Sequence, residues 1–170
     1  MVRSILLALS LLVFAGPALA DPAALDDPLL GHLAGSWVLT GTIDGQKTTQ
    51  DVTARWVLHH QYIEFREVAR DKQADGSPAY EATVYIGWNR GTMRYGCIWL
   101  DQFGGLLPRS VGSAAPDGNT LAFVFEGSDA SRFHTTFAYD PKADRWTMNM
   151  DQEEAGKRTP FARTVLTRAP

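Results

Sequence analysis

Three charged residues are the candidates for acid–base chemistry in this chain: Glu64, Arg66 and Asp101. Asp101 shares one face of an expected strand with Trp99, and an unpaired charge on an otherwise apolar face is costly when buried. Asp101 also ends that strand shortly before Gly104, where an aspartate can cap a turn. Both roles fit the residue, an acceptor at the rim of a cavity and a turn cap.

Glu64 and Arg66 belong to a strand whose inward face has two interpretations. They share one face, whereas the other face carries the more apolar Ile63 and Phe65. Since the apolar set belongs inside, we expect Glu64 and Arg66 to face solvent. The alternative is that both point inward and form a buried pair that holds the polar end of a ligand.

The histidines do not combine into a metal site. His59 and His60 are adjacent, so in a strand their side chains diverge, and no carboxylate or cysteine lies at a supporting spacing. His134 alternates with Phe133, which predicts the polar face of its strand. No Ser–His–Asp pattern, phosphate loop or pair of catalytic carboxylates stands out in the sequence. We expect neither a metal nor a cofactor.

Aromatic side chains gather on one face of the expected strands, and five of them are the candidate ligand-binding residues: Trp56, Trp88, Tyr95, Trp99 and Trp146. Flat apolar rings suit an aromatic or lipidic molecule, which a few polar groups would orient. A small barrel can also fill its interior with such rings. A ligand cavity and a filled core both fit the pattern.

An alternation of apolar and polar residues from Trp37 onward positions these side chains. In the last run, Phe161, Arg163 and Val165 share the parity of the apolar face. Turn-forming residues separate the runs: Asp44-Gly45, Asp75-Gly76-Ser77-Pro78, Asn89-Arg90-Gly91, Asp117-Gly118-Asn119, Asp140-Pro141 and Ala155-Gly156. Because no long helical crossover intervenes, about eight to ten strands predict an all-β fold, a single antiparallel meander barrel.

A short helix precedes the strands. Asp27 supplies an N-cap, Pro28 the first helical position, and Gly35 the residue just past the end. This helix is too short to stand alone, so we expect it to cap one end of the barrel.

Charge and cysteine content exclude several classes of protein. The formal net charge is −3, so a basic face for nucleic acid is not expected. Cys97 is the single cysteine, which excludes an intramolecular disulfide and is typical of a small buried residue.

Residues 1–20 have the features of a cleaved signal peptide. An apolar run extends from Ile5 to Phe14, and Ala18-Leu19-Ala20 supplies the small residues that a signal peptidase reads. That run is shorter than the ~20 residues of a membrane span. We expect cleavage after Ala20, one barrel domain over 21–170, and a periplasmic or secreted protein that does not span the membrane. An outer-membrane barrel is the alternative.

Gly35-Ser36-Trp37, after the short helix, resembles the Gly-x-Trp signature of lipocalin-like (calycin) barrels. In that superfamily the tryptophan closes one end of the barrel and packs under an arginine from the last strand. Arg168 is the best match for that arginine and Arg163 the second. Gly87-Trp88-Asn89 and Trp99-Leu100-Asp101 resemble a secreted bacterial lipocalin-like family of unknown function. The resemblance implies a barrel with a cavity, not an activity.

Haem barrels of the nitrobindin type are a related group that needs an axial histidine in the final strand. This chain has Phe161-Ala162-Arg163-Thr164-Val165-Leu166 there. The resemblance therefore does not extend to haem binding.

Three functions fit these observations. The first is a periplasmic or secreted protein that binds a small hydrophobic or aromatic molecule in its barrel. The second is an enzyme, an isomerase or lyase, with Glu64, Arg66, Asp101 or Tyr95 as acid–base groups in the same cavity. The third is an interaction module whose barrel is filled. One barrel hosts many functions, so the fold does not choose among them. We favour the binding protein.

The exported protein should begin at Asp21, because the small residues of Ala18-Leu19-Ala20 precede it. Intact-mass measurement of protein recovered outside the cytoplasm should give the mass of residues 21–170. A mass that still includes Met1 to Ala20 would contradict this expectation.

Overall fold

The computed structural model describes residues 23–104, 110–127 and 130–170. Their helix and ten strands are α1 (Pro28–Leu33), β1 (Gly35–Ile43), β2 (Gln46–Val57), β3 (Tyr62–Ala69), β4 (Glu81–Asn89), β5 (Arg94–Asp101), β6 (Val111–Ala114), β7 (Thr120–Glu126), β8 (Arg132–Asp140), β9 (Arg145–Glu154) and β10 (Lys157–Arg168).

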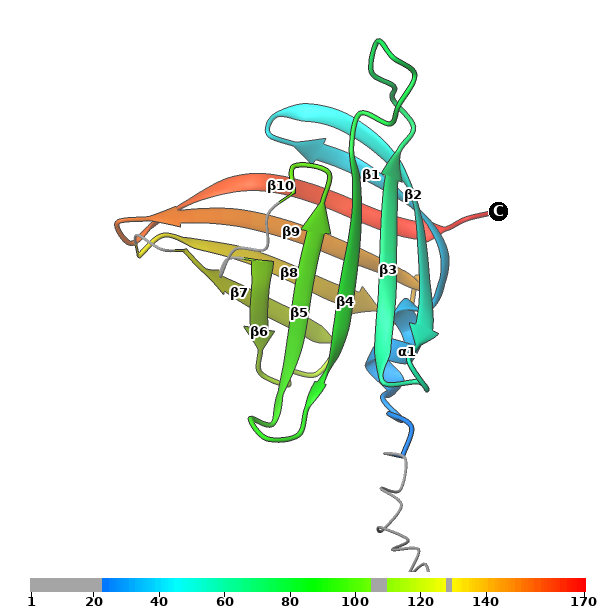
Figure 1. The fold of residues 1–170 in the computed structure, drawn as a ribbon, viewed down its shortest axis with the longest axis vertical. Coiled ribbons are helices and arrows are strands. Elements are labelled where there is room, and N and C mark those ends of the chain that lie inside the picture. The colour runs from blue at the N-terminus through cyan, green and yellow to red at the C-terminus, as the bar shows by residue number, and fades with distance from the viewer. Residues whose placement is uncertain (1–22, 105–109, 128–129) are drawn as a thin grey trace, which may run out of the picture.

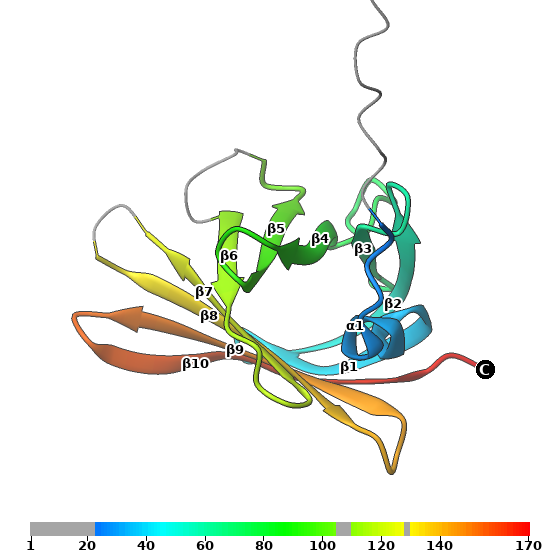
Figure 2. The same ribbon diagram turned by 90° about the horizontal axis from the view of Figure 1, so that it is seen from below.

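The strands form one closed barrel (Figure 1). Each strand pairs antiparallel with its neighbours in sequence, and β1 completes the circle by pairing with β10. Figure 2 views the barrel from the end that carries α1. The expected fold is confirmed: an all-β, single antiparallel meander barrel with a short N-terminal helix.

Two of the expected turns have the tightest hairpin geometry. Asp44 and Gly45 join β1 to β2 with φ angles of 48° and 71°, and Ala155 and Gly156 join β9 to β10 with 50° and 77°. Positive φ at both central positions is the type I′ conformation, whose twist matches that of the paired strands. Both turns lie at the end of the barrel away from α1.

The expected inward parity of Arg163 and Val165 is wrong. The register between β10 and β9 shifts between Pro160 and Ala162, so a bulge adds one residue to β10. One extra residue reverses the alternation beyond it. Ala162 and Leu166 are accordingly buried, and Arg163 is exposed and pairs with an aspartate of β9.

Helix α1 covers one end of the barrel, as expected. Asp27 Oδ1 accepts a hydrogen bond from the Leu30 N–H at 3.0 Å, and Pro28 begins the helix. Leu30 and Leu33 are completely buried. The second oxygen of Asp27 accepts from the Tyr95 hydroxyl at 2.7 Å, which ties the helix to β5.

Trp37 closes the same end, and Arg168 is its partner, as expected from the Gly-x-Trp resemblance. The Arg168 Cζ lies 3.7 Å from the centroid of the Trp37 ring, a cation–π contact. Trp37 Nε1 donates to the Leu33 carbonyl at 2.8 Å, and Arg168 Nη1 donates to the Ala34 carbonyl at 2.8 Å. Gly35 has a φ of 130°, and a Cβ there would collide with the Arg168 guanidinium. The signature therefore packs as one unit.

Strand β6 is the least paired part of the wall. Within the described ranges it pairs with β7 only through Gly112 with Phe125 and Ser113 with Val124. A Cβ on Gly112 would come within 2.8 Å of the Phe125 ring. The glycine therefore lets that ring lie against the β6 backbone.

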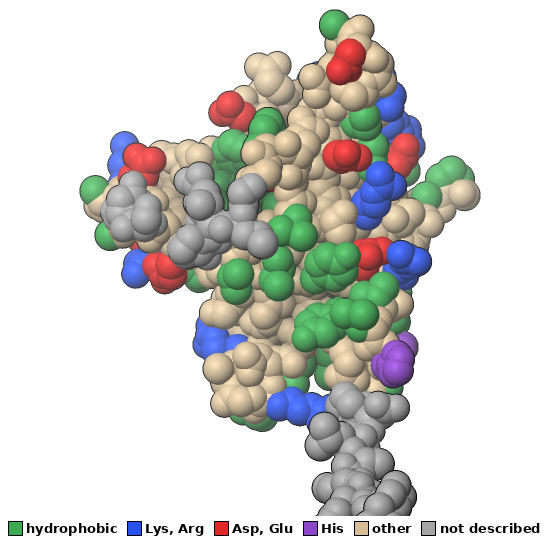
Figure 3. Space-filling model, viewed as in Figure 1, with side chains coloured by type: hydrophobic (Ala, Val, Ile, Leu, Met, Phe, Trp, Pro, Cys, Tyr) green, Lys and Arg blue, Asp and Glu red, His purple; other side chains and the backbone are tan. Residues whose placement is uncertain are grey.

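The outer surface carries exposed apolar side chains on β3, β5 and β6, namely Tyr62, Ile98, Leu100 and Val111 (Figure 3). The described residues contain no helix of the length and apolar character that a membrane crossing requires. The expected signal peptide and its cleavage after Ala20 lie outside the described residues.

Trp37→Ala should lower the free energy of unfolding by roughly 3–5 kcal/mol, because it removes a buried indole and leaves a void under α1. Arg168→Ala should lower it less, since that side chain is partly exposed. The two losses should not add, because each variant removes the same cation–π contact. Urea unfolding of both single variants and the double variant gives the coupling, and additive losses would contradict a closure that works as one unit.

Candidate functional site

A cavity of about 1050 Å³ opens at the end of the barrel away from α1. Its walls come from both tight hairpins and from the strand ends that face them, β3, β5, β7 and β8. Ligand pockets in proteins span roughly 300–1,000 Å³. The space is therefore large enough for a small molecule.

Aromatic and apolar side chains form much of the cavity wall. Trp99 comes from β5, Phe125 from β7, Phe133 from β8 and Phe161 from β10, and Met150 of β9 lies among them. Phe133 and Phe161 meet edge to face, with ring centroids 5.4 Å apart. This wall can bury an apolar body of the kind that hydrophobic pockets accept.

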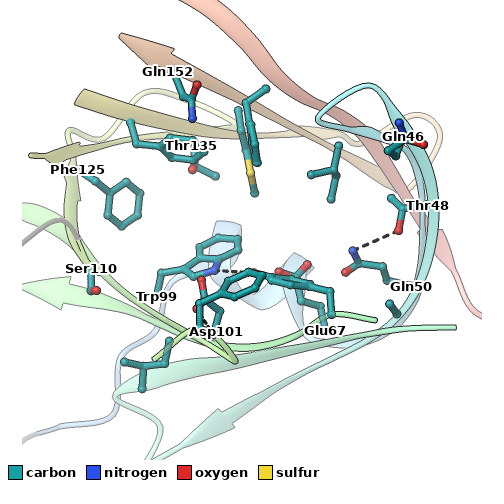
Figure 4. A pocket seen from close by; sticks show the side chains of 18 of the residues that line it. Gln46, Thr48, Gln50, Glu67, Trp99, Asp101, Ser110, Phe125, Thr135 and Gln152 are labelled. Carbon is teal, nitrogen blue, oxygen red and sulfur yellow. Dashed lines mark hydrogen bonds between the residues drawn. The ribbon is translucent and has the colours of Figure 1, made fainter. Parts of the chain in front are cut away.

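Glu67 is the most unusual residue of the cavity. Its side chain points inward from β3, is 1% exposed, and its Oε2 has no hydrogen-bond partner. In the register of the sheet, Glu67 lies opposite Ala82, and Ala82 lies opposite Asp101. The two carboxyl-bearing residues thus flank a methyl side chain on the inner face, and both line the cavity (Figure 4).

Two further polar groups in the wall lack partners. Gln50 is 1% exposed and its Oε1 accepts no hydrogen bond, while its Nε2 donates to Thr48 Oγ1 at 3.4 Å. Thr135, across the cavity on β8, is also 1% exposed with an unpartnered Oγ1 (Figure 4). Buried polar atoms in proteins are nearly always paired, so each such atom calls for an explanation.

Burial raises the pKa of Glu67 to about 8, and the negative charge of Asp101 adds to the effect. The carboxyl group is therefore mostly protonated at neutral pH and can donate as well as accept a hydrogen bond. Burial also raises the pKa of Tyr80, with Glu67 as the next cause. The Tyr80 oxygen accepts a hydrogen bond from Trp99 Nε1 at 3.1 Å, which fixes the indole in the wall.

Of the five aromatic residues expected to bind a ligand, only Trp99 is among the described residues that line the cavity. Trp56 stacks on His60, with ring centroids 4.0 Å apart. The other three, Trp88, Tyr95 and Trp146, lie toward the α1 end of the barrel. Trp88 packs on Tyr95, and the Tyr95 hydroxyl donates a hydrogen bond to Asp27. Trp146 Nε1 donates to the His32 carbonyl at 3.4 Å. The structure does not bring the five together.

Glu64 and Arg66 lie on the outer surface of β3, as the solvent-facing interpretation predicted. Glu64 is held by Arg55 at 2.7 Å and by the Tyr85 hydroxyl at 3.0 Å. Arg66 pairs with Glu81 at 3.4 Å. Neither side chain reaches the cavity, so the buried-pair alternative for them is wrong.

Asp101 caps a turn and also lies in the cavity wall, the two positions expected of it. Its Oδ1 accepts from the Phe103 N–H at 2.9 Å, which caps the turn after β5. It also lines the cavity beside Trp99. Of the three charged candidates, it is the one that shares the site.

The histidines lie apart from the cavity. His59 and His60 occupy the β2–β3 turn with positive φ angles, not a strand. His134 has the expected outward parity, yet it is only 7% exposed, and its Nε2 contacts Glu153 Oε2 at 2.8 Å. The described residues contain no group of three or more metal-ligating side chains.

Glu67 and Gln50 are site residues that the sequence reasoning missed. The signal was present, because Glu67 continues the inward set of Ile63 and Phe65, and Gln50 precedes Val52 at the same parity. A polar residue that continues an apolar inward series indicates a cavity position when space remains around it.

Comparisons with known proteins give no assignment. No protein-family model matches the sequence, and a search of curated proteins finds no matching relative. The resemblance to lipocalin-like barrels therefore rests on the closed barrel and on the contact between Trp37 and Arg168.

The free energy of unfolding should fall as pH rises from roughly 5 to 8, by up to about 1.4 kcal/mol per pH unit. The folded protein holds the Glu67 proton more tightly than the unfolded chain does, so folding loses that advantage as the proton leaves. The glutamine of the Glu67→Gln variant has no proton to lose, so the free energy of unfolding of this variant should fall less over the same pH range. Urea unfolding across this pH range measures it.

Glu64→Gln is the matched control, because it makes the same chemical change on the outer surface. The free energy of unfolding of this variant should fall between pH 5 and 8 as it does in wild type. An equal slope in wild type and Glu67→Gln would show that another group causes the pH dependence.

Proposed function

We propose that this protein binds a small, mainly apolar molecule in the open half of its barrel. The observation that carries the proposal is the cavity of about 1050 Å³, which holds buried polar atoms without partners in Gln50, Glu67 and Thr135. An apolar wall with a few convergent polar groups is the usual composition of a ligand site. A bound molecule would satisfy those polar atoms.

The division of the barrel supports a binding protein over a filled interaction module. Next to α1, the interior is packed with rings, and Trp37, Trp146, Phe65 and Phe137 are at most 1% exposed. Phe65 and Phe137 meet edge to face at 5.8 Å. Since aromatic packing fills only that half, the remaining space is a distinct feature of the barrel.

The proposed place of action is the periplasm or the exterior. The support is the sequence of residues 1–20, with Ala18-Leu19-Ala20 before the expected cleavage point. A binding protein there would capture or carry its ligand outside the cytoplasm.

Proton-transfer catalysis is the second candidate, and Glu67 favours it. A carboxyl group with a pKa of about 8 can give and take a proton at neutral pH, as an isomerase or lyase requires. Glu67 and Asp101, not Glu64 or Arg66, would be the acid–base groups. Glu67→Gln should then abolish turnover of a bound molecule while it leaves binding of that molecule in place.

Native mass spectrometry of protein taken from its own host should show retained small-molecule mass. Long-chain fatty acids, quinones and aromatic acids can then be titrated while tryptophan emission and melting temperature are followed. A ligand should raise the melting temperature with its concentration, as mass action requires.

Trp99→Leu should weaken both ligand responses, because Trp99 is the tryptophan whose indole lines the described cavity wall. Trp88→Leu is the matched control, since Trp88 packs on Tyr95 away from the cavity. The binding proposal fails if no retained mass is found, no ligand shifts either signal, and an experimental structure shows the cavity filled by side chains.

A further inference from the structure

The unpartnered polar atoms at the Glu67 end of the cavity are oxygens. Glu67 and Gln50 are diagonal neighbours on adjacent strands, because Glu67 pairs with Val52 and Gln50 pairs with Ala69. Such diagonal side chains on one face of a sheet are within reach of one another. The Gln50 carbonyl oxygen and Glu67 Oε2 are both unpartnered and buried, and Figure 4 shows both side chains pointing into the cavity.

Among the described residues, the groups that face Glu67 add negative charge or none. Asp101 lies two strands away across Ala82, and the Tyr80 hydroxyl, whose pKa the Glu67 charge helps to raise, is a second titratable group nearby. From β2 it faces Gln50 and Val52. The remaining charged side chains of the described lining lie nearer the mouth: Lys47, Asp71, Arg132, Glu153 and Glu154.

The two basic side chains among these lining residues, Lys47 and Arg132, do not pair with Glu67. Arg132 is held by Glu126 at 2.9 Å and by Glu153 at 3.4 Å. Lys47 is exposed near the start of β2, and its parity is opposite to that of the buried Gln50. Among the described residues, a negatively charged ligand group would therefore meet carboxyl groups at this end without a cation to offset them.

We propose that the ligand is an amphiphilic amine whose ammonium group docks on Glu67 and the Gln50 carbonyl while its apolar body lies along the aromatic wall. This proposal rests on the proposed function and names its ligand class. An ammonium group has three donors and no acceptor, which matches unpartnered acceptors. Trp99, whose Nε1 donates to the Tyr80 hydroxyl near Glu67, can add cation–π attraction.

Docking of an ammonium group requires Glu67 to lose its proton. At neutral pH the carboxyl group is mostly protonated, whereas an alkylammonium ion with a pKa near 10.4 is charged. Binding forms an ammonium–carboxylate pair and releases the Glu67 proton to solvent. Amine affinity should therefore rise about tenfold per pH unit between roughly pH 6 and 8 and then level off.

Three probes with the same apolar body separate the possibilities: phenylbutylamine, phenylbutanol and phenylbutyrate. We expect the amine to bind most tightly and the carboxylate most weakly at pH 7. Isothermal calorimetry in buffers of different ionisation enthalpy should show close to one proton released per amine bound and none per alcohol. The measured pH dependence of the amine should follow the tenfold rise.

Glu67→Gln should lower amine affinity at pH 8 by about ten- to a hundredfold, the loss of a charge-assisted hydrogen bond, and leave alcohol affinity within a few-fold. It should also remove the proton release. Glu64→Gln, on the outer surface, should change none of these values.

Binding of the alcohol or the carboxylate in preference to the amine would overturn the amine proposal and leave the binding function standing. Amine binding without proton release, or unaffected by Glu67→Gln, would overturn it as well. Failure of all three probes in wild type, together with no retained mass from the host, would count against the binding function itself.

Discussion

The width of a ten-strand barrel is the constraint on which the rest of the structure depends. Barrel diameter grows with strand number, and eight strands already enclose about as much space as inward side chains can fill. The interior of a wider barrel must be filled by additional elements, such as a helix, or remain partly open. Here α1 and the unit of Gly35, Trp37 and Arg168 close one end, and packed rings fill the half beside it. The other half is left as a cavity because nothing of comparable size reaches it from the described residues.

The cavity holds polar groups that weaken the fold. A buried carboxyl group and a buried amide oxygen without partners each lower stability, and apolar residues of similar size would pack at Gln50 and Glu67 without that loss. The described lining of the cavity contains three such atoms, in Gln50, Glu67 and Thr135. Unpartnered buried polar groups that lower stability are typical of a functional site. Their purpose would be the recognition of a molecule that pairs with them.

Most of the fold could be predicted from the sequence, whereas most of the site could not. Alternation from Trp37 onward, turn residues such as Asp44-Gly45, and the helix cap at Asp27 are local signals, and each is confirmed. Parity says which face a side chain occupies but not how far along the barrel axis it lies. Trp99 and Trp146 therefore looked equivalent, although one lines the cavity and the other packs near α1. The β10 bulge escaped prediction because it depends on pairing with β9.

The short pairing between β6 and β7 gives the barrel an uneven mechanical strength. Two residue pairs join these strands in the described ranges, whereas nine join β8 to β9. The free energy needed to part neighbouring strands grows with the number of hydrogen bonds that must break together, so local opening is easiest at this seam. Phe125 covers the seam from inside, against the backbone of Gly112. Because Phe125 also lines the cavity, the weakest part of the described barrel wall borders the cavity and not the packed half beside α1.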